Sequence, residues 1–228
     1  MKSKTALITA VIMAAVCLGL WLIISPSLEN NGSMSRQNEL LASIAGEIAD
    51  NAADDCTTQA DCHFEAEPEE TEHEPVLEAE PVYIPLYPLD DSEFPNAVTG
   101  IGIMTIDRIN LRLPIADGIS EAGLRIAPGR VPETAKIGET GNAVIAGHRN
   151  YTFGEMFNRL DEVEIGDIIG FQSRIGVMME FEVFEIIEIN PDDQIAFIQP
   201  VNESIITLYT CTPVREATHR LLVRAIKI

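Results

Sequence analysis

The sequence from Asn96 to Ile228 predicts an all-β domain, either a barrel or a sandwich. Short runs rich in Ile, Val and Phe recur there, separated by Gly, Pro and Asp, which is typical of strands and turns in all-β folds. One run alternates apolar with more polar residues, the period-two pattern of a half-buried strand, at Val177, Met179, Phe181 and Val183. With 228 residues and 46% apolar composition, the chain can bury a sizeable core.

Seven strands and two short helices follow from these patterns. The predicted strands are Gly100–Ile106, Leu111–Ile115, Asn142–Ala146, Asp167–Phe171, Val177–Ile189, Ile205–Thr210 and His219–Ile228. Short helices are predicted near Ser120–Ile126 and Thr152–Leu160. No internal repeat is visible.

The N-terminus predicts a membrane anchor over residues 1–25. Ala6–Ile24 is an uncharged apolar run, long enough to cross about 30 Å of hydrocarbon as a helix. Lys2 and Lys4 precede it and acidic residues follow, which places the N-terminus in the cytoplasm and the rest of the chain outside the cell. The alternative is a cleaved signal peptide, but the run ends in W-L-I-I-S-P, which offers no small-x-small cleavage site.

An acidic spacer is predicted over residues 26–95. The chain carries a net charge of −21, and half of its 36 acidic residues lie between Glu29 and Glu93. That charge excludes bulk attraction to nucleic acid or anionic lipid. Within the spacer, Arg36–Asp50 predicts a short amphipathic helix with Ser35 as N-cap, and the following stretch to about Glu80 is too polar to fold alone.

The segment from Pro81 to Pro95 differs from the rest of the spacer. It interleaves Tyr, Leu, Ile and Phe with four prolines, which predicts an extended chain that packs on the domain surface. Two roles remain open for it: a lid over a groove of the domain, or an extra layer packed on the domain wall.

Three of the four cysteines have no assigned chemistry. Cys17 lies in the apolar run, where it acts as a small hydrophobic residue. Cys56 and Cys62 can form a small disulfide loop outside the cell or remain thiols. Their spacing from His63 and His73 matches no zinc signature, so no metal site is predicted.

The fourth cysteine, Cys211, belongs to a constellation of residues at strand ends. It follows the predicted strand Ile205–Thr210, and Arg220 lies near the start of the next strand. If these two strands pair antiparallel, Cys211 and Arg220 face each other at the mouth of a hairpin. His148 ends its own strand, and the ends of barrel strands are natural places to build a site.

These three side chains suit acyl transfer. A Cys thiolate attacks a carbonyl carbon, a His imidazolium protonates the leaving amine, and Arg stabilises negative charge on the oxygen. Arg fits this task because it keeps its proton and presents several donors in a fixed fork.

The residues around this constellation resemble the sortase family. Residues 207–211 read T-L-Y-T-C and are similar to the TLxTC signature of sortases, with Arg220 nine residues further on. Residues 141–149 read G-N-A-V-I-A-G-H-R and resemble the family's histidine motif. The continuation C-T-P-V-R-E-A-T-H-R is similar to the pilus-building and related branches. The resemblance covers about Gly100 to Ile228.

The resemblance implies a closed eight-stranded β-barrel with short helices over residues 96–228. It also implies a cysteine transpeptidase that cleaves an LPxTG-like sorting signal, holds the surface protein or pilin as a thioester on Cys211, and transfers it to an amine of a peptidoglycan precursor or a pilin Lys. His148 and Arg220 take the acid/base and oxyanion roles, and no organic cofactor is needed. Thr210, Arg149 and Tyr151 are candidate substrate-binding residues, whereas His219 is a weaker candidate base than His148.

The subclass and two competing functions stay open. The sequence lacks the Asp-Pro-aromatic lid motif and the second membrane helix of many pilus-building sortases. A housekeeping or sporulation-linked enzyme that anchors proteins to peptidoglycan therefore remains an alternative to a pilin polymerase. Within enzymes, water replacing the amine gives a hydrolytic cysteine peptidase. From another class, an anchored adhesion barrel with an inert Cys211 predicts no reaction of that thiol with alkylating reagents.

Overall fold

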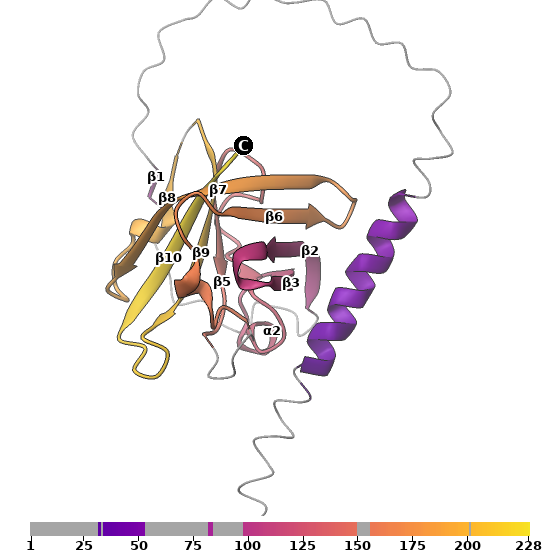
Figure 1. The fold of residues 1–228 in the computed structure, drawn as a ribbon, viewed down its shortest axis with the longest axis horizontal. Helices are drawn as coiled ribbons and strands as arrows, with labels where there is room; N and C mark the ends of the chain where they lie inside the picture. The colour runs from indigo at the N-terminus through magenta and orange to yellow at the C-terminus, as the bar shows by residue number, and fades with distance from the viewer. Residues whose placement is uncertain (1–31, 33, 53–81, 84–97, 150–155, 201) are drawn as a thin grey trace, which may run out of the picture.

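Eight strands close into a barrel in the computed structural model, which describes residues 32, 34–52, 82–83, 98–149, 156–200 and 202–228 (Figure 1). Around the barrel, the order is β10-β7-β6-β2-β3-β4-β5-β9. The strands are β2 (Thr99–Ile106), β3 (Leu111–Asp117), β4 (Gly129–Arg130), β5 (Gly141–Ala146), β6 (Ile168–Ser173), β7 (Met178–Ile189), β9 (Ser204–Thr212) and β10 (His219–Lys227). The closed eight-stranded barrel expected from the resemblance is therefore confirmed.

Two kinds of pairing set the positions that matter for function. The sequence-adjacent hairpins β2–β3, β6–β7 and β9–β10 are antiparallel. In contrast, β5 pairs with β9 in parallel, from Gly141 opposite Ser204 to Ala146 opposite Tyr209. Parallel neighbours end at the same edge of a sheet. The residues that follow β5 therefore emerge beside the last residues of β9.

The barrel wall separates two apolar clusters. The interior cluster includes Ile206 and Leu208 of β9 and Leu221 and Val223 of β10. The outer cluster lies on the opposite face of the wall. It contains Val144 of β5, Ile189 of β7 and Leu222 of β10, and Val131, Ala196 and Phe197 pack on them from connections between strands. This alternation follows from the period of two along each strand. The outer cluster covers one side of the barrel next to the ends of β5 and β9.

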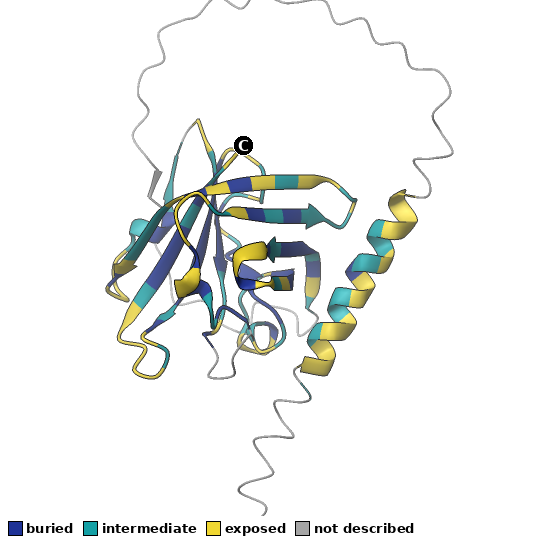
Figure 2. Ribbon diagram, viewed as in Figure 1, coloured by how far each residue is buried: buried dark blue, intermediate teal, exposed yellow. Residues whose placement is uncertain are grey.

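A helix over residues 34–52 packs along the barrel wall, where the sequence predicts one over residues 36–50 (Figure 1). Its barrel-facing side is the less exposed one (Figure 2). Ile44 is 2% exposed and lies over Gly100 of β2, where an added Cβ would stand 2.4 Å from the Ile44 Cδ1 atom. Gly100 therefore provides the notch that receives the helix.

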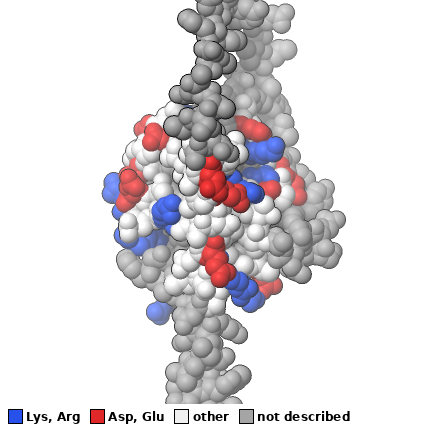
Figure 3. Space-filling view, turned by 90° about the vertical axis from the view of Figure 1, so that its right-hand side faces the viewer, with Lys and Arg blue, Asp and Glu red and all other residues white. Residues whose placement is uncertain are grey.

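Polar contacts fix the two ends of this helix to different parts of the barrel. Near its start, the Gln37 amide donates to the Met156 sulfur at 3.5 Å. Near its end, Glu47 pairs with Arg174 at 2.6 Å and the Asn51 amide donates to the Arg174 carbonyl at 3.0 Å. Acidic and basic side chains are interspersed on this side of the folded part (Figure 3).

Smaller elements decorate the barrel. The helix α2 (Glu121–Leu124) begins at Ser120, whose hydroxyl accepts from the Gly123 amide at 3.1 Å, in agreement with the helix predicted near Ser120. The 3₁₀ helices η2 (Asp107–Ile109), η3 (Leu160–Glu162) and η4 (Ile195–Phe197) fill connections between strands. Outside the barrel, β1 (Val82–Tyr83) pairs antiparallel with β8 (Ile198–Gln199).

The structure differs from the sequence-based prediction in several places. The sequence patterns predict neither β4 nor β8, because each has only two residues, too few to show any alternation. The strand β9 extends through Thr212, so Cys211 lies within this strand and not after it. The described part of the helix predicted over Thr152–Leu160 is a turn that leads into η3. No helix in the described ranges is long and apolar enough to span a membrane. The apolar run 6–24, Cys56 and Cys62 lie outside those ranges.

Candidate active site

Cys211 and Arg220 occupy opposite positions on paired strands. Their Cα atoms are partners in the β9–β10 ladder, as the predicted hairpin requires. Cys211 lies two residues after Tyr209 and Arg220 two residues before Leu222, and Tyr209 and Leu222 both pack in or against the outer cluster. Because strand side chains alternate between faces, Cys211 and Arg220 share the outer face of the wall. Cys211 is half-buried and its thiol is free.

His148 is brought to the same end of the barrel by the parallel pairing of β5 with β9. The Gly147 amide donates to the Tyr209 carbonyl at 3.0 Å, and the Thr210 hydroxyl donates to the Gly147 carbonyl at 2.7 Å. A Cβ on Gly147 would lie 2.7 Å from the Phe157 ring, so only glycine lets the chain pass there. The His148 backbone therefore reaches the rim two residues after β5, beside the end of the cysteine strand.

Burial tunes the imidazole of His148. The pKa of His148 lies below its usual value of 6.5, chiefly because burial disfavours the charged ring. The positive charge of Arg125 lowers the pKa further, and the negative charge of Glu121 opposes this shift. Both charges come from α2 and its C-cap. At neutral pH the neutral imidazole is thus favoured, the form able to accept a proton from a thiol.

Arg220 is held by its own turn. Its Nη1 atom donates to the carbonyls of Ala217 and His219 at 3.1 and 2.9 Å. The pKa of the Tyr209 hydroxyl is raised, mainly by burial, while the nearby charge of Arg220 acts in the opposite direction. Both residues therefore lie on the same part of the rim as Cys211.

The three candidate substrate-binding residues have different surroundings. Thr210 is 1% exposed and holds the Gly147 carbonyl. The Arg149 side chain is 4% exposed and contacts Asp161, Thr212 and two carbonyls. Tyr151 lies outside the described residues. His219, the weaker candidate base, is exposed and shares a 2.9 Å hydrogen bond with the Thr218 hydroxyl.

An apolar surface adjoins this rim. Half-buried apolar residues pack against the outer cluster on the face of Cys211, namely Ile119, Ala146, Ile187, Ile195 and Tyr209. The rings of Tyr209 and Phe197 lie 5.8 Å apart. Such a surface can receive apolar side chains of a peptide. Ile119, Ile187 and Ile195 were not among the sequence-based candidates, because they come from separate connections and strands.

A hollow lies elsewhere on the barrel. A cavity of about 280 Å³ is lined by Asp117, Arg130, Lys136, Phe171, Met179 and neighbouring residues. None of the candidate catalytic residues lines it, so it is distinct from the rim that carries Cys211. Within the described ranges, no three His, Cys, Asp or Glu side chains gather into a set that could hold a metal ion.

Comparison with known proteins agrees with this geometry. A family model described as the sortase domain matches residues 104–228. Sortase A of Corynebacterium diphtheriae, as a lid mutant, is 33% identical with a TM-score of 0.55, over 58% of this chain and 72% of that one. Comparison with curated protein sequences gives no significant match.

Two further solved structures are similar to the same extent. A Clostridium perfringens sortase D5 transpeptidase is 32% identical with a TM-score of 0.52, over 57% of this chain and 79% of that one. Streptococcus agalactiae sortase C1, in complex with MTSET, is 34% identical with a TM-score of 0.54, over 57% of this chain and 69% of that one. From the barrel and the family match together, the chain belongs to the sortase family of cysteine transpeptidases.

Proposed function

We propose that this sortase cleaves an LPxTG-like sorting signal and joins the released carbonyl to an amine acceptor. The observation that carries this proposal is the pairing of Cys211 with Arg220 across β9 and β10, with His148 at the end of the adjacent strand β5. The apolar surface beside them suits the Leu and Pro of such a signal.

The proposed reaction has two steps with balanced proton transfers. His148 takes the proton of the Cys211 thiol, the resulting thiolate attacks the Thr carbonyl carbon of the signal, and Arg220 stabilises the oxyanion. The Thr–Gly bond then breaks, and the His148 imidazolium gives its proton to the departing Gly amine. In the second step the acceptor amine attacks the thioester, His148 takes a proton from it, and the thiolate of Cys211 leaves.

The acceptor is proposed to be an amine of a lipid-linked peptidoglycan precursor or the Lys of a pilin. The match to sortases of classes A, C and D supports a transpeptidase and fits either acceptor. We further propose that residues 6–24 anchor the enzyme in the cell membrane with its N-terminus in the cytoplasm and its barrel outside, because basic residues precede this run and acidic residues follow it.

The decisive experiment incubates the protein with a panel of sorting-signal peptides, with and without a peptidoglycan-type amine or a pilin Lys peptide. Mass spectrometry then identifies the bond cleaved, the thioester on Cys211 and the transferred product. Cys211→Ala should abolish both adduct and cleavage, since no thioester can form without the thiolate. Cleavage retained by that variant contradicts the assignment, and cleavage without transfer to either amine favours the hydrolytic peptidase.

A further inference from the structure

Arg149 connects three segments at the rim of the active site. Its Nη2 atom lies 2.8 Å from the Asp161 carboxylate. Its Nη1 atom donates to the Thr212 hydroxyl at 3.0 Å and reaches the Cys211 carbonyl at 3.5 Å. Its Nε atom approaches the Asn158 carbonyl at 3.4 Å. All three guanidinium nitrogens thus have partners within the protein.

Because the Arg149 guanidinium is buried, its hydrogen-bond donors need partners within the protein. The Arg149 side chain is 4% exposed, whereas Asp161 remains 57% exposed. A buried guanidinium is tolerated only when its donors are satisfied, because it has lost its hydration. The chain of contacts continues from Thr212, whose hydroxyl donates to the Glu188 carboxylate of β7 at 3.2 Å. Arg149 is therefore built into the protein rather than aimed at an incoming ligand.

Arg149 follows His148 directly, just beyond the point where the ladder between β5 and β9 ends. The ladder between β5 and β9 ends at Ala146, and the Gly147 amide makes the last backbone bond to β9. Beyond that point, three described contacts hold the histidine segment: the Thr210 hydroxyl donates to the Gly147 carbonyl at 2.7 Å, the Phe157 amide donates to the His148 carbonyl at 3.1 Å, and the Arg149 side chain donates to Thr212. The Thr210 and Arg149 contacts reach the segment that carries Cys211; the Thr210 contact precedes His148 in the chain, and the Arg149 contact follows it.

We infer that Arg149 is a positioning residue that holds His148 in alignment with the Cys211 thiol by tying the end of β5 to the end of β9. The inference rests on the proposed roles of Cys211 and His148. Proton transfer between a thiol and an imidazole requires hydrogen-bond distance, and displacements approaching 1 Å can lower rates on the order of 10²-fold. Arg149 thus acts through His148 and does not itself contact substrate.

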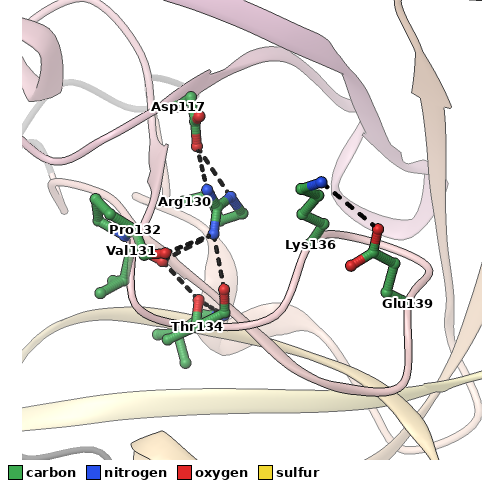
Figure 4. A network of polar contacts seen from close by, with 8 residues as sticks. Asp117, Arg130, Val131, Pro132, Thr134, Lys136 and Glu139 are labelled. Carbon is green, nitrogen blue, oxygen red and sulfur yellow. Dashed lines mark hydrogen bonds and ion pairs between the residues drawn. The ribbon is translucent and has the colours of Figure 1, made fainter.

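Arg130 offers a matched control within the same barrel. It is also buried, at 8% exposure, and pairs with Asp117 at 2.6 Å (Figure 4). Its Nη1 atom donates to the carbonyls of Val131, Pro132 and Thr134. None of these partners makes a described contact with residues 147–149 or 210–212 at the rim. Val131 and Thr134 bond to Val144 of β5, four residues before His148. Loss of the Arg130 fork should therefore reduce stability without altering the alignment of His148 and Cys211.

The experiment compares Arg149→Lys with Arg130→Lys in the full chain. Three quantities are measured: the melting temperature, kcat and KM for a sorting-signal peptide, and the rate at which iodoacetamide alkylates Cys211 between about pH 5 and pH 9, the range in which a paired thiol and imidazole titrate. Alkylation needs no substrate, so it reports the state of the thiol even if the peptide is not the true signal.

We expect both variants to melt at lower temperature, because Lys cannot replace a planar fork. Unlike Arg130→Lys, Arg149→Lys should lower kcat by about 10- to 100-fold. Its KM should stay within about twofold of the parent, and the pH profile of Cys211 alkylation should shift. Asp161→Asn and Thr212→Val should give the same changes to a smaller degree, and they preserve Arg149 itself.

Two results overturn the inference. If KM rises while the alkylation profile stays unchanged, Arg149 binds substrate directly. If Arg149→Lys, Asp161→Asn and Thr212→Val alter only the melting temperature, as the control Arg130→Lys does, Arg149 is merely structural. Failure of the parent protein to cleave any peptide bears on the proposed function, whereas the alkylation profile still tests the alignment.

Discussion

At the residue scale, the pairing of Arg220 with Cys211 across two strands leads to a specific prediction. Arg220→Lys keeps the positive charge but removes the planar fork, so it should lower kcat on the order of 10²-fold or more with little change in stability. Steady-state kinetics on a sorting-signal peptide and a melting curve check this. Arg224→Lys on the same strand is the control, because Arg224 pairs with Glu185 away from Cys211. Turnover within a few-fold of the parent reassigns Arg220 to a structural role.

The lowered pKa of His148 predicts how stability depends on pH. Because the folded protein disfavours the imidazolium, the unfolded chain binds a proton more readily below the usual pKa of 6.5. This contribution to stability is fully present above pH 6.5 and is lost as the pH falls through 6.5 toward the folded pKa. His148→Gln should therefore lose less stability than the parent between about pH 7.5 and pH 5. Denaturant titrations at several pH values measure the difference.

Charge variants at α2 separate the causes of this shift. Arg125→Gln removes a charge that lowers the pKa of His148, so the pKa should rise. Glu121→Gln removes a charge that raises it, so the pKa should fall. NMR titration of the imidazole gives both values. Shifts in the reverse directions contradict the described electrostatics.

The sequence identifies the catalytic candidates better than the residues that support them. Cys211, Arg220 and His148 each stand at the end of a recognisable strand, and both motifs are contiguous. Asp161, Thr212 and Glu188 carry no such signal. They meet near Arg149 only because separate segments fold together. Contacts of this kind depend on tertiary packing, which neither spacing nor periodicity encodes.

At the element scale, Ile44 is the residue of the helix over residues 34–52 that the barrel buries most deeply. Ile44→Ala removes its contact over Gly100. A loss of about 2 kcal/mol in the free energy of unfolding is expected, near the lower end for buried aliphatic truncations. Denaturant unfolding measures it. Met34→Ala serves as control, since Met34 is 42% exposed, and equal losses in both variants contradict the described packing.

Sequence patterns predict the long strands of the barrel but not its shortest ones. The long strands β7 and β10 are visible because their alternation or apolar content extends over many residues. The strand β4 has two residues, and its place in the barrel comes from neighbours on both sides, Ala116 of β3 and Ile145 of β5. Closure of the barrel thus depends on the pairing of a strand that local sequence patterns do not predict, although the family resemblance implies a closed barrel of eight strands.

At the scale of the whole molecule, the helix over residues 34–52 runs along the barrel between the catalytic rim and the opposite end. Gln37 near its start contacts Met156, in the segment that follows His148, and Asn51 near its end contacts Arg174 in the β6–β7 turn. The N-terminal end of the helix therefore lies on the side of the segment that follows His148, and its C-terminal end lies at the β6–β7 turn.

Truncation of the N-terminal part tests how much of the chain the barrel requires, and three forms are informative: removal of residues 1–31, 1–80 and 1–95. All eight barrel strands begin at or after Thr99, so the first two forms should fold and cleave peptide. Removal of residues 1–80 should lower the melting temperature relative to removal of 1–31, because Ile44 and the Glu47–Arg174 pair are lost. Equal melting temperatures contradict the packing of the helix.

Removal of residues 1–95 distinguishes a lid from a layer of the wall. It deletes β1, which pairs with β8 at Ile198 and Gln199. The Gln199 side-chain oxygen accepts a hydrogen bond from the backbone amide of Asn142 at 2.7 Å, and its nitrogen donates to the backbone carbonyl of Asn142 at 3.0 Å. The strand β8 therefore supports β5. Because that pairing acts on the wall, we expect a lower melting temperature without faster alkylation of Cys211 than in the form lacking residues 1–80. If the form lacking residues 1–95 instead shows faster alkylation and faster cleavage at an unchanged melting temperature, residues 81–95 act as a lid whose removal exposes Cys211.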